Sequence, residues 1–158
     1  MTQFFRAGVG AVICNDKGMV LTFERSDTAG AWQFPQGGID DHEEPETSVY
    51  REITEETGIR HDALRLIRPC PHLLSYELPA QWRTPKVGRG QTQQWYLFLL
   101  LTGSEAIALP SPGEFRQWRW TTFPDLLTIT APFRLPVYRF LAQEFSEIKA
   151  LRVQGHNP

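Results

Sequence analysis

The sequence predicts an α/β (α+β) domain, in which short strands form a sheet and two helices pack on it. The chain has 158 residues, enough to bury a core without disulfides or a structural metal. Hydrophobic residues make up 41% and charged residues 22%, which is typical of folded globular proteins. Several β-rich runs are bounded by turn residues, whereas two segments have helical spacing. Because no repeat or linker divides the chain, we expect one domain over residues 1–158.

The strands are predicted from β-rich runs. Residues 9–14 and 19–24 flank the turn signal Asn-Asp-Lys-Gly and are expected to form a hairpin. Residues 32–34 form a short strand that ends at Pro35, and the Gly pair at 37–38 then breaks the chain. Further strands are expected at residues 72–78, 95–102 and 115–121, and the last of them has one buried face because its two Trp residues alternate with polar residues.

Two helices are predicted. The first covers residues 45–57, because Pro45 is tolerated in a first helical turn and Gly58 is a common helix terminator. The second covers residues 136–148, where apolar residues recur at helical spacing. These apolar residues are Val137, Leu141, Phe145 and Ile148.

The charge and cysteine content exclude several classes of protein. The formal net charge is −2, so the chain lacks the basic field that grips nucleic acid non-specifically, and a DNA partner is not expected. No stretch approaches the roughly 20 apolar residues of a membrane helix, so no membrane association is expected. Cys14 and Cys70 have no metal-binding spacing, which favours core packing in a reduced, cytoplasmic protein.

The most informative feature is a cluster of carboxylates on the first helix. At 100° per residue, Glu52, Glu55 and Glu56 fall within an arc of about 100°. Like charges at this spacing are unfavourable, and the helix dipole disfavours anions near the carboxyl end. One guanidinium, Arg51, cannot neutralise all three carboxylates, whereas a hard divalent cation such as Mg²⁺ prefers these oxygen ligands. The alternative is a solvated acidic helix face.

The residues around the cluster favour the metal site. The segment 37–59 matches every fixed position of the Nudix box, a Gly, five residues, Glu, seven residues, then Arg-Glu-apolar-any-Glu-Glu-any-Gly-apolar. The matching residues are Gly37, Glu43, Arg51, Glu52, Ile53, Glu55, Glu56, Gly58 and Ile59. The chain thus resembles the Nudix hydrolases. The segments WQFPQGGI, GQTQQWYLF, EFRQWRW and PFRLPVYRFL look like those of the bacterial RNA pyrophosphohydrolase and dinucleoside polyphosphate hydrolase branch.

The resemblance implies a fold and a metal site. The fold would be a mixed β-sheet sandwiched between helices, with the box as a loop-helix-loop. The cofactor would be Mg²⁺, or Mn²⁺ in its place, with more than one ion. Glu52 would also be the general base, and Arg51 would orient Glu43 or Glu55. The implied metal ligands are Glu52, Glu55, Glu56, Glu114 and the carbonyl of Gln36.

The resemblance also implies substrate contacts. An aromatic ring beside arginines suits base stacking and phosphate binding, and the implied residues are Arg6, Arg25, Phe133 and Arg134. The alternative places Phe133 in the core and the arginines at the surface. The polar segment 81–94 contains Trp82, Arg83, Lys86 and Arg89, and it either covers a nucleotide chain or is a solvated connector. Two positions depart from the branch. This chain has Gln94 where the branch usually has Lys, and it has His42 where the branch usually has Gly.

The implied activity is Mg²⁺-dependent hydrolysis of a diphosphate linkage in a nucleotide. The leading substrates are the 5′-triphosphate end of RNA and dinucleoside polyphosphates such as diadenosine tetraphosphate. A small nucleotide, either ADP-ribose or a damaged nucleoside triphosphate, is the second possibility, and a non-catalytic module that binds RNA or nucleotides is the third. No sequence signature of a covalent nucleophile or of a P-loop is found. The sequence does not indicate the oligomeric state.

Overall fold

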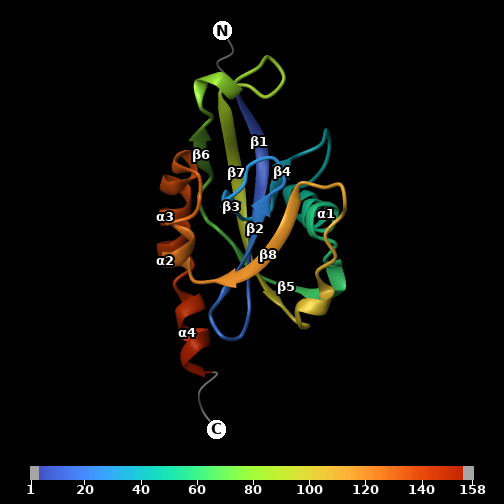
Figure 1. The fold of residues 1–158 in the computed structure, drawn as a ribbon, viewed down its shortest axis with the longest axis vertical. Coiled ribbons are helices and arrows are strands. Elements are labelled where there is room, and N and C mark those ends of the chain that lie inside the picture. Colours follow the sequence, from blue (N-terminus) through green and yellow to red (C-terminus); the bar gives the residue numbers. More distant parts are fainter. Residues whose placement is uncertain (1–3, 155–158) are drawn as a thin grey trace.

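The computed structural model describes residues 4–154 and has three layers (Figure 1). A mixed sheet of eight strands lies between α1 on one face and the helices α2, α3 and α4 on the other. The predicted α/β fold with a sheet between helices is therefore confirmed. None of the helices in the described part of the chain is long and apolar enough to cross a membrane.

The sheet is built around the parallel pair of β1 and β7. Strand β1 pairs with β7 over its whole length, from Phe5 opposite Gly90 to Cys14 opposite Leu99. All other strand pairs are antiparallel, and the main path runs β3-β2-β1-β7-β5, with β4 on β1, β6 on β7 and β8 on β2. The strands are β1 (Phe5–Cys14), β2 (Val20–Arg25), β3 (Trp32–Gln33), β4 (Gln36–Gly38), β5 (Leu64–Pro69), β6 (Leu74–Glu77), β7 (Gly90–Leu100) and β8 (Phe115–Thr121).

The helices are α1 (Pro45–Thr57), α2 (Phe123–Leu126), α3 (Leu135–Glu144) and α4 (Glu147–Gln154). Single 3₁₀ turns cover His61–Ala63, Ala80–Trp82, Ser104–Ala106 and Pro132–Arg134. The prediction for α1 is confirmed at both ends. Gly58 adopts the left-handed conformation, with φ at 75°, and its N–H donates to the carbonyl of Thr54.

Alternate residues of β1 pack on the two faces of the sheet. Val9, Ala11 and Ile13 join the core cluster under α1, whereas Val12 and Cys14 join the cluster under α2–α4. The whole strand is buried from residue 8 onward, because both faces are covered. The predicted hairpin forms, since β1 and β2 pair antiparallel with Cys14 opposite Val20.

The predictions for the second half of the chain need corrections. Strand β5 is absent from the prediction, because the apolar residues Leu66 and Ile67 are adjacent and interrupt the alternation of apolar and polar residues, and the pairing with β7 shifts register at this point. Strand β7 begins at Gly90 rather than at residue 95, so the connector within 81–94 is shorter than expected. The Gly pair at 37–38, predicted as a break, belongs to strand β4, where Gly38 pairs with Gly8 of β1.

The predicted helix over residues 136–148 is wrong in its continuity. It is divided into α3 and α4 at Phe145, whose backbone is not helical. Arg68 explains the break, because its guanidinium donates to the main-chain carbonyl of Glu144 at 2.6 Å and forms ion pairs with Glu144 and Glu147. A side chain from β5 thus satisfies a carbonyl at the end of α3. The apolar spacing continues across the break, with Phe145 and Ile148 both buried.

Candidate active site

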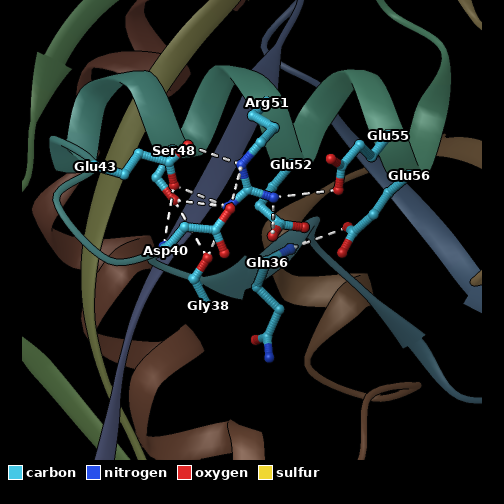
Figure 2. A network of polar contacts seen from close by, with 9 residues as sticks. All are labelled: Gln36, Gly38, Asp40, Glu43, Ser48, Arg51, Glu52, Glu55 and Glu56. Carbon is cyan, nitrogen blue, oxygen red and sulfur yellow. Dashed lines mark hydrogen bonds and ion pairs between the residues drawn. The ribbon is translucent and has the colours of Figure 1, made fainter.

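One face of helix α1 packs on the core, and the neighbouring face carries the carboxylates of the Nudix box. Val49 and Ile53 are buried under the helix, as their spacing predicted. Glu52 and Glu56 are directed toward β4, and their side chains flank Gln36 (Figure 2). Glu56 is only 8% exposed and accepts a hydrogen bond from the Gln36 main-chain N–H at 3.2 Å. The helix and β4 therefore hold two carboxylates in a partly dry environment.

Gly37 allows this close packing. A Cβ atom at position 37 would collide with the carboxyl group of Glu52. A larger residue would therefore displace the Glu52 carboxyl group from its place between the helix and β4. The first glycine of the box thus has a steric role that its place in strand β4 makes apparent.

Arg51 is the centre of the polar network (Figure 2). Its guanidinium makes a two-pronged ion pair with Glu43, with Nε to Oε2 at 2.8 Å and Nη2 to Oε1 at 2.9 Å. Nη1 donates to Glu52 Oε1 at 2.9 Å and to Glu55 Oε2 at 3.2 Å. Nη2 also donates to the carbonyl of Gly38 at 2.9 Å. Arg51 therefore contacts both carboxylates that were predicted as its partners, and it holds Glu52 as well.

The pKa values of the carboxylates diverge. Hydrogen bonds from Arg51 lower the pKa of Glu43 from 4.5 to about 2. Burial raises the pKa of Glu56 well above its ordinary value, and the charges of Glu114 and Glu52 raise it further. Burial also raises the pKa of Glu52, although Arg51 opposes this shift. Glu52 and Glu56 are thus the carboxylates of the site whose negative charge is least compensated by neighbouring groups.

Glu114 completes the group of carboxylates from a loop before β8. Its charge acts on Glu56, which places it near the helix despite the distance in sequence. Its carboxylate accepts a hydrogen bond from Arg25 Nη1 at 3.3 Å and remains 43% exposed. Glu55 differs from the others, because it is 58% exposed and its contact is with Arg51.

The chemistry of these donors suits a divalent cation such as Mg²⁺. All of them offer carboxylate oxygen, and the repulsion of Glu56 by Glu52 and by Glu114 is of the kind that such an ion relieves. Within residues 4–154, no three His, Cys, Asp or Glu side chains already converge on a single metal position. Ion binding would thus draw these carboxylates closer together.

A cavity of about 450 Å³ adjoins the carboxylates. Three of the four predicted substrate residues line it, namely Arg25, Phe133 and Arg134. The other lining residues are Asp27, Thr28, Ala31, Trp32, Gln33, Leu78, Trp82 and Ala131. Arg25 contacts Glu114 at one end, so the cavity and the carboxylate group are continuous through this pair.

Phe133 is one wall of the cavity and is half-buried. Its ring lies 5.6 Å from the ring of Trp82 in an edge-to-face arrangement and 5.6 Å from that of Tyr76. The alternative that Phe133 is a core residue is thus partly right, since it also packs against the core cluster under α3. Trp82 also lines the cavity. It belongs to the segment 81–94, for which the sequence left open whether it covers a nucleotide chain or is a solvated connector.

Arg134 is a buried cation, with 6% of its surface exposed. Its Nη1 donates to Gln36 Oε1 at 2.6 Å, and its guanidinium lies over the rings of Phe133 and Tyr76. In the described part of the chain, no carboxylate forms an ion pair with it. Gln36 thus bridges the two halves of the site, because its main-chain N–H holds Glu56 while its side chain holds Arg134 and, through a 2.9 Å bond, the hydroxyl of Tyr76.

Two residues singled out in the sequence lie outside the cavity, and two residues of the site had no predicted role. Arg6 is exposed on β1 with its guanidinium against Gly38, and it does not line the cavity. Gln94 donates to the carbonyl of Cys70 at 2.7 Å and is also absent from the lining. The sequence assigned no role to Gln33, which accepts a bond from Arg25 in the cavity, or to Tyr76. The motif around Trp32 contained a signal for Gln33, but nothing in the sequence marked Tyr76.

The loop before α1 contains a strained residue. His42 has a positive φ of 64° in a turn that is closed by the Glu43 N–H donating to the carbonyl of Asp40 at 3.0 Å. Position 42 is the third residue of this four-residue turn, where a positive φ favours glycine. The departure from Gly at this position therefore costs conformational energy while it places Glu43 against Arg51.

We expect His42→Gly to stabilise the protein by up to about 1 kcal/mol, because glycine relieves the left-handed strain at the cost of some chain entropy. His42→Val should destabilise by at least about 1 kcal/mol, since a β-branched side chain resists this conformation. Urea unfolding midpoints of the three proteins check this order. A lower midpoint for His42→Gly would mean that the imidazole stabilises the loop through a contact that outweighs the strain.

Comparison with known proteins identifies the family of this chain. The family model described as NUDIX domain matches residues 4–141. The chain is 37% identical over 153 residues to an RNA pyrophosphohydrolase of Psychromonas ingrahamii, covering 93% of this chain and 84% of that protein. It is 36% identical over 159 residues to the RNA pyrophosphohydrolase of Shigella boydii, covering 98% and 89%.

Solved structures share the fold at lower identity. A binary complex of a C. elegans Ap4A hydrolase has a TM-score of 0.69 at 21% identity and covers 92% of this chain and 98% of its own. The E. coli dihydroneopterin triphosphate pyrophosphohydrolase has a TM-score of 0.69 at 21% identity, with coverage of 96% and 99%. Since the family model spans most of the chain and the curated relatives exceed 30% identity, this protein belongs to the Nudix family.

Proposed function

We propose that this chain is a Mg²⁺-dependent hydrolase of diphosphate linkages in nucleotides, with the 5′-triphosphate end of RNA as its main substrate. Dinucleoside polyphosphates such as diadenosine tetraphosphate are the second substrate class. One observation carries the proposal: a group of crowded carboxylates adjoins a cavity with aromatic walls and a buried arginine, and Gln36 bridges them. The relatives named RNA pyrophosphohydrolase support the choice of RNA.

Glu52, Glu56 and Glu114 would hold the metal, joined by Glu55 and the carbonyl of Gln36. A bound Mg²⁺ or Mn²⁺ neutralises phosphate oxygens and lowers the pKa of an attacking water. The number of carboxylates suits more than one ion, because each ion needs several oxygen ligands.

Glu52 is the proposed general base. Arg51 holds its Oε1 atom, which leaves Oε2 to receive a proton. Burial raises the pKa of Glu52, which brings its basicity closer to that needed at neutral pH. Arg51 and Glu43 would act by positioning Glu52 rather than by touching the substrate.

The cavity would take the nucleotide. A base would stack on the exposed face of Phe133 or Trp82, whose rings lie edge to face at the cavity. The Arg134 guanidinium, which is buried beside the neutral Gln36, offers a charge that a phosphate can neutralise. Arg25, at the border with Glu114, would orient the phosphates toward the carboxylates. Arg6 would contact a more distant part of the substrate.

The proposal is tested by assaying the purified chain with Mg²⁺ on 5′-triphosphorylated RNA, diadenosine tetraphosphate and ADP-ribose in parallel, with products identified. Release of pyrophosphate or phosphate from RNA at the highest kcat/KM is expected. A preference for ADP-ribose would assign the chain to small nucleotides, and no turnover of any of them would leave the non-catalytic alternative. We further propose that the protein works in the cytoplasm as one domain over residues 1–158, without a DNA partner.

We expect Phe133→Ala to raise the KM for the nucleotide substrate about tenfold or more, because loss of base stacking costs about 1–3 kcal/mol. The melting temperature should fall by only a few degrees, since the ring is half-buried and its loss opens the cavity rather than the core. Steady-state kinetics and thermal unfolding measure both effects. A large loss of stability with an unchanged KM would return Phe133 to a purely structural role.

A further inference from the structure

A second cavity lies on the flank of α1 that is turned away from the catalytic carboxylates. Its volume is about 570 Å³, and we call it the flank pocket. At 100° per residue, Tyr50 points to the side of the helix opposite Glu52 and Glu56, so the two sites are separate. The flank pocket is lined by Glu44, Pro45, Glu46, Thr47, Tyr50, His61 and Tyr96.

A flat aromatic wall forms one side of the flank pocket. The ring of Tyr50 stacks on that of His61 with centroids 3.8 Å apart and planes inclined by 14°. The rings of Phe98 and Tyr50 pack edge to face with their centroids 5.1 Å apart, which holds Tyr50 in place. This wall is thus fixed before any ligand binds.

Tyr96 supplies a polar group that lacks a partner. The residue is only 6% exposed, because its ring packs beside Phe98 in the core under α1. Throughout residues 4–154, no group forms a hydrogen bond with its hydroxyl. Burial raises the pKa of Tyr96, and the charges of Glu46 and Glu44, which line the same pocket, raise it further. The side chain of Tyr96 is thus held in place by the core, while its unpartnered hydroxyl lies at the flank pocket and is available to a ligand.

Two carboxylates complete the flank pocket. Glu44 is the residue before α1, but its side chain makes no capping hydrogen bond, and Glu46 follows in the first turn. Neither forms an ion pair with any residue in the described part of the chain. Both are exposed and available to a cationic ligand.

We propose that the flank pocket binds an organic cation of the guanidinium class. A guanidinium is planar, so it can stack on the aromatic wall formed by the Tyr50–His61 pair while its N–H groups reach Glu44 and Glu46. The Tyr96 hydroxyl would accept a further N–H. The same chemistry is offered by a free guanidinium compound and by an arginine side chain of another protein.

The first test titrates the ¹⁵N-labelled full chain with N-acetyl-arginine amide. N-acetyl-citrulline amide is the matched control, because a neutral urea replaces the guanidinium at nearly the same shape. Saturable shifts confined to the flank pocket are expected, with citrulline binding at least about tenfold more weakly. A pentapeptide with a central arginine separates the two sources: tighter binding of the peptide indicates a protein partner, whereas equal binding indicates a small molecule. No saturable shift with either cation, or equal binding of citrulline, would overturn the proposal.

The second test uses variants that preserve the fold. Tyr96→Phe removes only the hydroxyl, and Glu46→Gln removes only a charge, and each should weaken arginine amide binding at least threefold. Asp16→Asn, at an exposed position in the β1–β2 turn, is the charge-matched control and should bind like the original chain. Nucleotide hydrolysis should be unchanged in all three variants, so the result is independent of the proposed hydrolase function. Unchanged cation affinity in both pocket variants would refute the site.

Discussion

Glu56→Gln is expected to reduce Mg²⁺-dependent turnover at least about a hundredfold while the protein stays as stable or becomes more stable. The activity should fall because Glu56 is the most buried of the proposed ligands, and an amide gives the ion one neutral oxygen in place of a charged group. The fold should persist because glutamine can still accept the N–H of Gln36, while the repulsion with Glu52 and Glu114 disappears.

The same substitution should change how stability depends on pH. The pKa of Glu56 is raised by burial in the folded chain, whereas the unfolded chain has the ordinary value of 4.5. As the pH rises above 4.5 the unfolded state loses its proton first, so a metal-free protein loses stability toward neutral pH. Glu56→Gln removes this loss. Urea unfolding at pH 5 and pH 7.5 in the presence of EDTA should show the smaller change in the variant.

Glu46→Gln is the matched control for turnover, since Glu46 is an exposed carboxylate on the same helix. It should retain full turnover with the same metal dependence. The ligand assignment fails if Glu56→Gln keeps normal kcat, or if Glu46→Gln loses as much activity as Glu56→Gln.

Arg51→Ala should lower both stability and activity. The guanidinium donates to Glu43, Glu52 and Glu55 and to a main-chain carbonyl, so its removal leaves several carboxylates without a counter-charge. We expect a loss of about 2–3 kcal/mol, which is below the range for fully buried pairs because Arg51 is 25% exposed. Turnover should fall about 10- to 100-fold, the usual cost of losing a group that orients metal ligands. Denaturant unfolding and steady-state kinetics measure the two effects.

Arg51→Lys distinguishes geometry from charge. Lysine keeps the positive charge but cannot make the two-pronged contact with Glu43 while reaching Glu52. It should therefore recover part of the stability and little of the activity. Full recovery of kcat by lysine would show that the charge alone matters.

The acid sensitivity of the original chain should follow Glu43, whose stabilising ion pair is present above pH 4.5 and is lost as the pH falls toward its pKa of about 2.

Helix α1 could be predicted closely because its signals are local. Pro45 and Gly58 act within one turn of the helix ends, and the burial of Val49 and Ile53 follows from the helical period. The clustering of Glu52 and Glu56 on one face follows from the same period, which is why the sequence alone predicts the carboxylate group.

Features that depend on distant contacts were beyond such reasoning. The end of α3 depends on Arg68, which belongs to strand β5 at the end of the main strand path. No spacing rule connects this strand with the end of the helix. Strand β4 exists because Gly37 and Gly38 pair with β1, although glycines normally suggest a break. Tyr76 joins the site through the side chain of Gln36, forty positions earlier in the chain.

The bridging position of Gln36 has a thermodynamic consequence. An ion that pulls Glu56 inward also acts on the Gln36 main-chain N–H, which donates to Glu56. The side chain of Gln36 in turn accepts a hydrogen bond from Arg134. Cation and nucleotide affinities are therefore expected to be coupled. Linkage makes this coupling reciprocal, so each ligand changes the affinity for the other by the same factor.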